Sequence, residues 1–130
     1  MAKRAAAVPE AAAIWVPIGD LLPWDKNPRK NDPAVEKIAE SIRRFGFGAP
    51  ILARANGDVI AGHTRLKAAS KLGLDRVPVR YLDLDPADAR LLALADNKLG
   101  EIADWDETLL AEILRDLEPA DAAVAGFDAA

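Results

Sequence analysis

The chain has 130 residues, of which 51% are hydrophobic, and this is enough for one domain with a buried core. It contains no cysteine, which excludes a disulfide framework, a thiolate nucleophile and a zinc–thiolate site. No apolar stretch is long enough for a signal peptide or a membrane span, so we expect a cytoplasmic protein without membrane contact.

The net charge of −4 hides an uneven distribution along the chain. Residues 1–80 contain 14 lysines and arginines against 8 acidic residues, whereas residues 81–130 contain 3 against 13. A basic part joined to an acidic part indicates where an anionic ligand would dock, although charges of this kind also serve solubility alone.

The first predicted elements carry clear boundary signals. Residues 1–13 are rich in alanine and are expected to be a disordered leader. A short strand is predicted at Trp15–Ile18, at a sheet edge because Pro17 has no N–H to donate. A helix is predicted to start at Asp32, which is followed by a proline, and to end at Gly46. Its buried stripe is expected to consist of Val35, Ile38, Ile42 and Phe45.

The middle of the chain predicts a hairpin, a helix and a strand. The hairpin is indicated by Asn56-Gly57 between two short apolar runs, residues 50–53 and 59–61. The helix covers about residues 63–72 and is closed by Gly73. The strand covers residues 77–82.

Two helices are predicted in the acidic part. Asp85 caps the first, and its apolar residues before Gly100 are Leu91, Leu92, Leu94 and Ala95. Asp104 and Glu107 resemble a capping box for the second, which Pro119 is expected to end. This acidic last helix is interpreted as a solvated face, or as an intramolecular or dimer contact for the basic part.

The order of these elements predicts a small α+β domain, with a mixed sheet and packed helices. The domain is expected to cover residues 14–118, and residues 119–130 are expected to be a flexible tail or linker. Trp15 and Trp105 are interpreted as core or packing residues.

The junction at Gly62 has the clearest chemistry. An apolar strand leads into the glycine, and a helix begins at once. The first N–H groups of a helix have no partner within it and carry partial positive charge, so such a junction makes an anion site, most often for phosphate. Thr64 can cap the helix or bond a phosphate oxygen, and Arg65 can bind phosphate bidentately. Positive charge continues along the exposed side of the helix through Lys67 and Lys71.

Simpler alternatives stay open at this junction. Strand–glycine–helix junctions are common, and most bind nothing. His63 is the only histidine in the chain, and a lone histidine is more often a surface or capping residue than a catalyst. A metal site would have to rest on carboxylates, so no metal ligand is assigned.

The run Gly62-His-Thr-Arg-Leu-Lys-Ala68 resembles the Gly-x-x-Arg-x-x-Ala box of the ParB/sulfiredoxin superfamily. Two earlier stretches are similar to further boxes of that family: Trp15-Val-Pro-Ile-x-Asp-Leu-Leu-Pro with Asn27-Pro-Arg29, and Phe47-Gly-Ala-Pro50-Ile-Leu. Ala95-Asp-Asn-Lys-Leu99 lies where partition proteins have Glu-Asn-x-x-Arg. The match covers about residues 14–115.

This resemblance implies a phosphate-binding loop for a nucleotide, CTP as in partition proteins or ATP as in sulfiredoxins, with Mg²⁺. It places the phosphates on Gly62, His63, Thr64 and Arg65, with Asn97 and Lys98 reaching them or the Mg²⁺ from the third helix. The chain departs from partition proteins, which usually have Glu-Arg at His63-Thr64 and an arginine where Lys98 stands. Sulfiredoxin chemistry is excluded because its catalytic cysteine is absent.

A narrower resemblance is to phage and bacterial proteins in which a ParB-like domain precedes a DNA methyltransferase. His-Thr-Arg-Leu-x-Ala-Ala, Val-Pro-Val and Ala-Asp-Asn-Lys-Leu followed by Trp-Asp are typical of them, and all occur here. The chain has no Asp/Asn-Pro-Pro-Tyr/Trp motif, so it is not itself a methyltransferase. The resemblance implies a C-terminal methyltransferase domain as a partner.

The leading hypothesis is therefore a nucleotide-binding, DNA-associated module, with a homodimer as one expected assembly. Five cations are candidate contacts to DNA or nucleotide: Lys26, Arg29, Lys30, Lys67 and Lys71. The alternatives are a nuclease or nucleotide triphosphatase, for which His63 is the candidate catalytic residue, and a ligand-free targeting domain of a methyltransferase.

Overall fold

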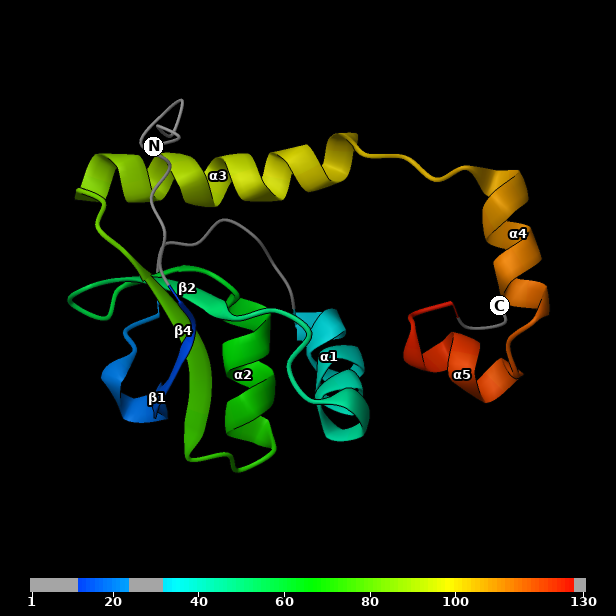
Figure 1. Cartoon of the computed structure of the whole chain (residues 1–130), viewed down its shortest axis with the longest axis horizontal. Coiled ribbons are helices and arrows are strands. Elements are labelled where there is room, and N and C mark those ends of the chain that lie inside the picture. Colours follow the sequence, from blue (N-terminus) through cyan, green and yellow to red (C-terminus); the bar gives the residue numbers. More distant parts are fainter. Residues whose placement is uncertain (1–11, 24–31, 128–130) are drawn as a thin grey trace, which may run out of the picture.

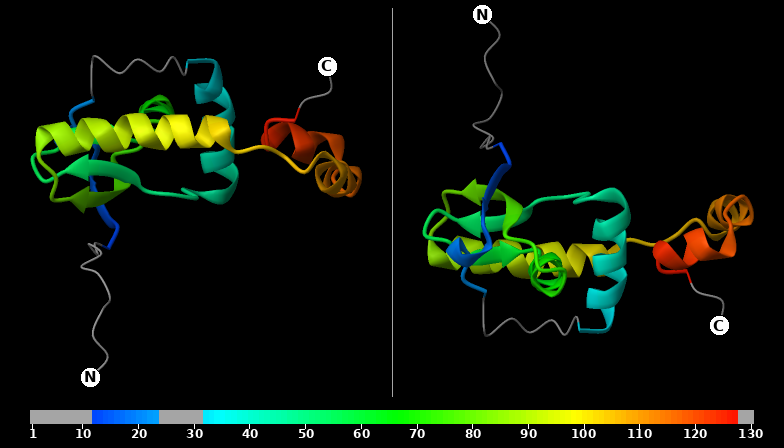
Figure 2. Two further views of the ribbon diagram at one scale, coloured as in Figure 1. Left: turned by 90° about the horizontal axis from the view of Figure 1, so that it is seen from above. Right: turned by 90° about the horizontal axis from the view of Figure 1, so that it is seen from below.

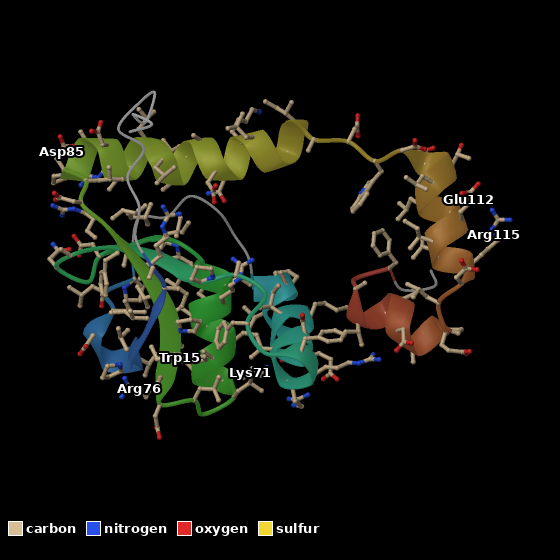
Figure 3. The ribbon with its side chains drawn as sticks, viewed as in Figure 1. Trp15, Lys71, Arg76, Asp85, Glu112 and Arg115 are labelled. Atoms are coloured by element: carbon tan, nitrogen blue, oxygen red, sulfur yellow. The ribbon has the colours of Figure 1, made fainter. Side chains whose placement is uncertain are left out.

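A four-stranded mixed sheet organises the computed structural model, which describes residues 12–23 and 32–127. The strands are β1 (Ile14–Pro17), β2 (Ile51–Arg54), β3 (Val59–Ala61) and β4 (Arg76–Leu82), in the order β1-β4-β2-β3. β1 pairs antiparallel with β4, β3 pairs antiparallel with β2, and the central pair β2–β4 is parallel. The edge position predicted for the first strand is confirmed. The Arg76 guanidinium further ties this edge down by donating to the Trp15 carbonyl oxygen over 2.8 Å (Figure 3).

One face of the sheet carries the main core. Side chains alternate between the faces of a strand, so Ile51, Ala53 and Val79 share the face that is covered by α2 (His63–Lys71). There they pack with Leu66 and Ala69 of the helix. A second helix, α1 (Asp32–Phe45), lies against α2 and forms its own small cluster from Ala39, Ile42 and Ala68.

The opposite face of the sheet is covered in part by α3 (Pro86–Ile102). Ile60 packs with Ala89 and Ala93 of this helix, and Leu52 and Leu82 border the cluster. Small alanines at the contact let the helix approach the sheet closely. The order of layers is therefore α1, α2, sheet and α3 (Figures 1 and 2).

Beyond α3 the chain turns away from the sheet. A linker leads to α4 (Glu107–Arg115) and α5 (Pro119–Val124), and α5 returns to lie beside α1 (Figure 1). No described residue after Ala93 is buried. Among the described residues, no helix is long and apolar enough to cross a membrane.

The glycine signals in the first two thirds of the chain are confirmed. Gly46 ends α1 with φ +80°, and Gly73 follows α2 with φ +74°. Gly57 forms the tip of the β2–β3 hairpin with φ +98°, and the Asn56 side chain accepts a hydrogen bond from the Asp58 N–H. These glycines occupy left-handed backbone positions that other residues adopt at a cost.

One prediction about a buried side chain is wrong. Phe45 is 69% exposed, because it lies in the last turn of α1 beyond the cluster around Ala68, and the Arg44 guanidinium lies 5.1 Å from its ring centroid. In α3, Leu91 and Leu94 are exposed, and the smaller alanines Ala89 and Ala93 make the contact with the sheet.

Three predicted boundaries in the acidic part are also corrected. α3 continues through Gly100 to Ile102, because one glycine within a helix costs only about 1 kcal/mol. The cap of α4 is Asp106, whose carboxylate accepts from the Leu109 N–H, rather than Asp104. Pro119 begins α5 instead of only ending α4, since proline suits the first turn of a helix, so the expected irregular tail contains a helix.

The two tryptophans are packing residues at the surface rather than in the core. Trp15 is 57% exposed and makes an edge-to-face contact with Phe47 at 6.0 Å between ring centroids. Trp105 makes the same kind of contact with Phe127 at 5.6 Å. The predicted leader and the loop around Lys26 lie largely outside the described residues.

Candidate anion-binding site

The start of α2 needs a glycine for two separate reasons. Gly62 has φ +96° and ψ +23°, in the left-handed region that glycine adopts readily. A Cβ atom at this position would also lie 3.2 Å from the Ile51 Cα. The strand β3 therefore enters the helix through a tight turn, and the Gly62 carbonyl accepts the first helical hydrogen bond, from the Leu66 N–H over 2.9 Å.

The start of α2 differs from the starts of α3 and α4 in how it is capped. α3 begins with the Asp85 carboxylate accepting from the Asp88 N–H over 2.8 Å (Figure 3), and α4 begins in the same way with Asp106. The N-cap residue of α2 is Gly62, which has no side chain to cap the helix, and the first turn contains no acidic residue. The α3 and α4 helices thus place a carboxylate of the chain at their positive ends, whereas the first turn of α2 has no acidic side chain of its own.

Arg65 is a second feature of the α2 start that suits an anion. It lies in the first turn and is half-buried, and its side chain makes no hydrogen bond or ion pair with any residue of the described ranges. Arginine side chains that lose solvent normally gain a carboxylate or carbonyl partner, because an unmatched charge is costly to desolvate. A bound phosphate would supply this partner in bidentate geometry.

His63 and Thr64 complete the first turn. Partial burial lowers the pKa of the His63 imidazole below its usual value, and the nearby positive charge of Lys67 lowers this pKa further. The imidazole is therefore neutral at pH 7 and acts as a hydrogen-bonding group rather than as a cation. Thr64 lies inside α2, whose N-cap residue is Gly62, so the capping role considered for Thr64 is wrong. Its hydroxyl group belongs to the same first helical turn as Arg65.

The third helix passes the start of α2. Because β3 packs against α3 and ends at Ala61, directly before Gly62, α3 passes over this end of α2 (Figures 1 and 2). Asn97 follows Ala93 by four residues, so it shares the face of α3 that contacts the sheet. Lys98 is exposed, and its ammonium lies 3.6 Å from the Glu101 carboxylate on the same helix. Asn97 therefore lies on the sheet-facing side of α3, whereas Lys98 lies on its exposed surface.

The other predicted cations have separate positions. Lys71 at the end of α2 forms an ion pair with Glu36 of α1, and Lys67 is exposed one turn before it. The predicted contacts Lys26, Arg29 and Lys30 lie outside the described residues.

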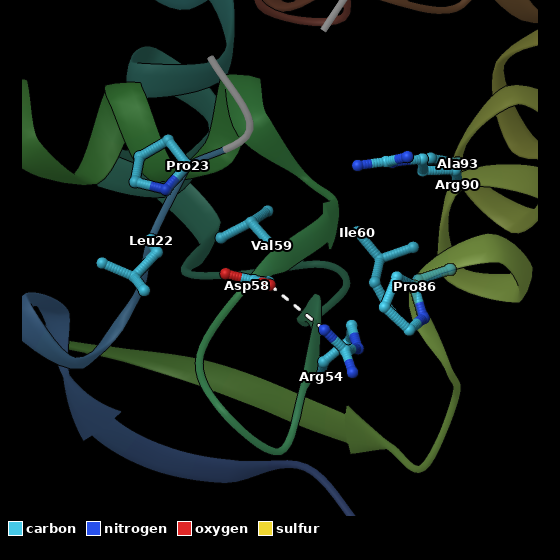
Figure 4. A pocket seen from close by; sticks show the side chains of 10 residues that line it. Leu22, Pro23, Arg54, Asp58, Val59, Ile60, Pro86, Arg90 and Ala93 are labelled. Atoms are coloured by element: carbon cyan, nitrogen blue, oxygen red, sulfur yellow. Dashed lines mark hydrogen bonds and ion pairs between the residues drawn. The ribbon is translucent and has the colours of Figure 1, made fainter. Parts of the chain in front are cut away.

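A pocket of about 190 Å³ lies on the same seam between β3 and α3 (Figure 4). Its walls include Val59, Ile60 and Ala93, together with an ion pair between Arg54 and Asp58 at 3.2 Å. Arg54 is held further by donating from Nε to the Leu84 carbonyl oxygen over 2.8 Å. The pocket includes none of the predicted phosphate ligands. No local sequence pattern predicts this pocket, because it depends on how the β2–β3 hairpin and α3 meet.

Metal ligands are sparse in this region. Within residues 12–23 and 32–127, no group of three histidine or carboxylate side chains is placed to hold a metal ion. Mg²⁺ is commonly held by one or two carboxylates together with substrate phosphates rather than by an all-protein cage.

Comparison with known protein families identifies the family of the chain. The model of the ParB N-terminal domain matches residues 3–98, which is most of the chain. The chain belongs to the ParB N-terminal domain family. A relative, the probable plasmid-partitioning protein ParB of Thermus thermophilus, is 45% identical over 94 residues, covering 69% of this chain. The chain spans about a third of that relative's length, since the match covers 32% of it.

Solved structures agree with this assignment. A C-terminally truncated ParB from Caulobacter crescentus, complexed with CTP-γ-S, superposes with a TM-score of 0.69 at 24% identity, covering 90% of this chain and 72% of that one. Sulfiredoxin from Arabidopsis thaliana superposes with a TM-score of 0.52 at 24% identity, covering 62% of this chain and 94% of that one. These likenesses confirm the predicted α+β fold, while the family rests on the match to the ParB N-terminal domain, and the roles of single residues at α2 stay predictions.

Proposed function

We propose that this ParB-like domain is a DNA-associated module that binds a nucleoside triphosphate, with the phosphates at the start of α2. The observation that carries the proposal is the uncapped helix start beside the unengaged guanidinium of Arg65. Backbone N–H groups, the helix dipole and a bidentate arginine are the elements from which proteins build phosphate sites. The Caulobacter relative with CTP-γ-S and the plasmid-partitioning relative support CTP and DNA as the ligands to test first.

Mg²⁺ would be held mainly by the phosphates themselves. The described residues offer no carboxylate cluster at the α2 start, so they do not form a metal site without a nucleotide. The Thr64 hydroxyl on α2 and the Asn97 amide on α3 are candidate uncharged oxygen ligands for this Mg²⁺. We therefore expect Mg²⁺ to raise nucleotide affinity without binding to the empty domain.

Isothermal titration calorimetry with CTP, ATP, GTP and UTP, with and without Mg²⁺, tests this function. Loss of a charged hydrogen-bond partner costs about 1.5–3 kcal/mol, so Arg65→Ala should weaken binding by about ten-fold or more. Arg43→Ala is the matched control, because Arg43 pairs with Glu40 on the outer side of α1 and should leave binding unchanged. Absence of binding for all four nucleotides, or equal affinity in Arg65→Ala, contradicts the proposal.

The same samples separate binding from turnover. Release of inorganic phosphate, or cleavage of plasmid DNA with Mg²⁺, would indicate the alternative enzymatic function, and His63→Ala should then abolish it. The neutral imidazole of His63 is suited to accept a proton, which is the single observation on the side of that alternative.

A further inference from the structure

The pocket between the β2–β3 hairpin and α3 contains none of the residues expected to hold phosphate. Its volume is about 190 Å³. Pockets for drug-sized ligands measure roughly 300–1,000 Å³, so this pocket suits a smaller molecule.

Apolar side chains supply seven of the ten residues that line the pocket. Ile60 of β3 packs there with Ala89 and Ala93 of α3, and all three are buried. Leu22 and Pro86 extend the apolar lining on either side (Figure 4). Because part of this lining belongs to the packed core, the apolar surface is already formed before a ligand enters. A ligand with an apolar body gains by leaving water here.

The other three lining residues are charged, and their charges do not cancel. The Arg54 guanidinium is already matched, since it lies 3.2 Å from the Asp58 carboxylate and its Nε donates to the Leu84 carbonyl oxygen. Arg90 of α3 is exposed, and it makes no hydrogen bond or ion pair with any other residue that the structure describes. Its side chain extends from α3 toward the β3 side of the pocket (Figure 4). Two arginines and one aspartate thus leave the pocket with one uncompensated positive charge.

From this combination we propose that the pocket binds a small carboxylate with a short apolar body, of the aromatic or branched aliphatic kind. The planar guanidinium of Arg90 donates two parallel hydrogen bonds to the carboxylate, while the apolar body lies against Ile60 and Ala93. A doubly charged phosphate matches this site less well, because it exceeds the single free charge and meets the Asp58 carboxylate. This site is separate from the proposed nucleotide site and does not depend on it.

Nuclear magnetic resonance titration of the isotope-labelled full chain with sodium benzoate tests the pocket. A ligand of this size should bind with a dissociation constant of about 1 mM. The amide signals of Ile60, Ala89 and Ala93 should shift along one common saturation curve. Benzyl alcohol has the same ring without the charge, so it should bind about five-fold more weakly or worse, because the charged hydrogen bonds are lost.

Matched variants assign the charge that holds the carboxylate. Arg90→Gln should weaken benzoate binding by about five-fold or more and leave benzyl alcohol binding unchanged. Arg43→Gln should behave like the parent, because Arg43 pairs with Glu40 on the outer side of α1. Arg65→Ala should also leave benzoate binding unchanged, since Arg65 does not line the pocket.

Three results would overturn the proposal. They are the absence of a saturable shift at the pocket signals, an unchanged affinity for benzoate in Arg90→Gln, and a loss of benzoate binding in Arg65→Ala, which would place the carboxylate at the start of α2. Circular dichroism checks that each variant keeps its helices.

Discussion

Two regions of the molecule are stabilised by different interactions. We call β1–β4, α1 and α2 the sheet lobe, and residues 94–127 the C-terminal arm. The lobe contains nearly all the buried side chains, and three of its larger ones are fully enclosed: Ile51, Val77 and Val79. The arm contains no buried residue, and its helices depend on caps and on polar contacts with α1. Burial of apolar surface is the dominant favourable term in folding. The stability of the chain should therefore reside in the lobe, while the arm should be free to move without unfolding it.

The same substitution should have opposite effects in the two regions. Gly57 in the lobe has φ +98°, and a Cβ atom there would lie 2.3 Å from the Asp20 carbonyl oxygen. Gly57→Ala combines left-handed strain of about 1–3 kcal/mol with overpacking of about 1–3 kcal/mol, so it should lower the free energy of unfolding by roughly 2–6 kcal/mol. Urea denaturation followed by circular dichroism measures this loss.

Gly100→Ala in the arm is the matched control. Gly100 lies inside α3 with open space around its Cβ position. Alanine should stabilise this helix by about 0.5–1 kcal/mol, since glycine is the poorer helix former. If Gly57→Ala and Gly100→Ala lowered the free energy of unfolding equally, the lobe and the arm would not differ in the way proposed.

Truncation of one large apolar residue in each region gives the next largest effect. Ile51 of β2 is fully buried under α2, so Ile51→Ala should lower the free energy of unfolding by about 2–5 kcal/mol. Leu94 is 48% exposed at the start of the arm, and Leu94→Ala should change the free energy of unfolding by about 0.5 kcal/mol or less. Thermal unfolding of both variants, with the parent beside them, makes the comparison. A large decrease in the free energy of unfolding of Leu94→Ala would show that Leu94 is packed in the core in solution.

The two regions also differ in how well the sequence predicts them. In the lobe, Asn56-Gly57, Gly62 and Gly73 mark turns whose backbone angles need glycine, so local signals predict the hairpin and α2 correctly. In the arm, Gly100 and Pro119 are ambiguous signals. A glycine can lie within a helix, and a proline can begin one as well as follow one.

Long-range features could not be predicted in either region. The parallel pairing of β2 with β4 depends on tertiary packing, as does the choice of alanines rather than leucines at the α3 contact. At the candidate site, the strand–glycine–helix pattern predicts the position of Gly62 and Arg65. The unengaged Arg65 side chain and the pocket between β3 and α3 depend on tertiary structure, so no local pattern predicts them.

The smallest expected effect lies at His63, the only histidine of the chain and a residue of the lobe. Partial burial lowers its pKa in the folded state below its value in the unfolded chain. Between these two pKa values the unfolded state binds more protons, so the free energy of unfolding falls as the pH falls through about 6.5. The parent should therefore lose more stability between pH 7.5 and 5.5 than His63→Gln does, in urea titrations at both values. A phosphate at the α2 start favours the imidazolium and should reduce this difference, which links the measurement to the proposed site. Identical pH profiles of the parent and His63→Gln would mean that the imidazole is as well solvated in the folded chain as in the unfolded one.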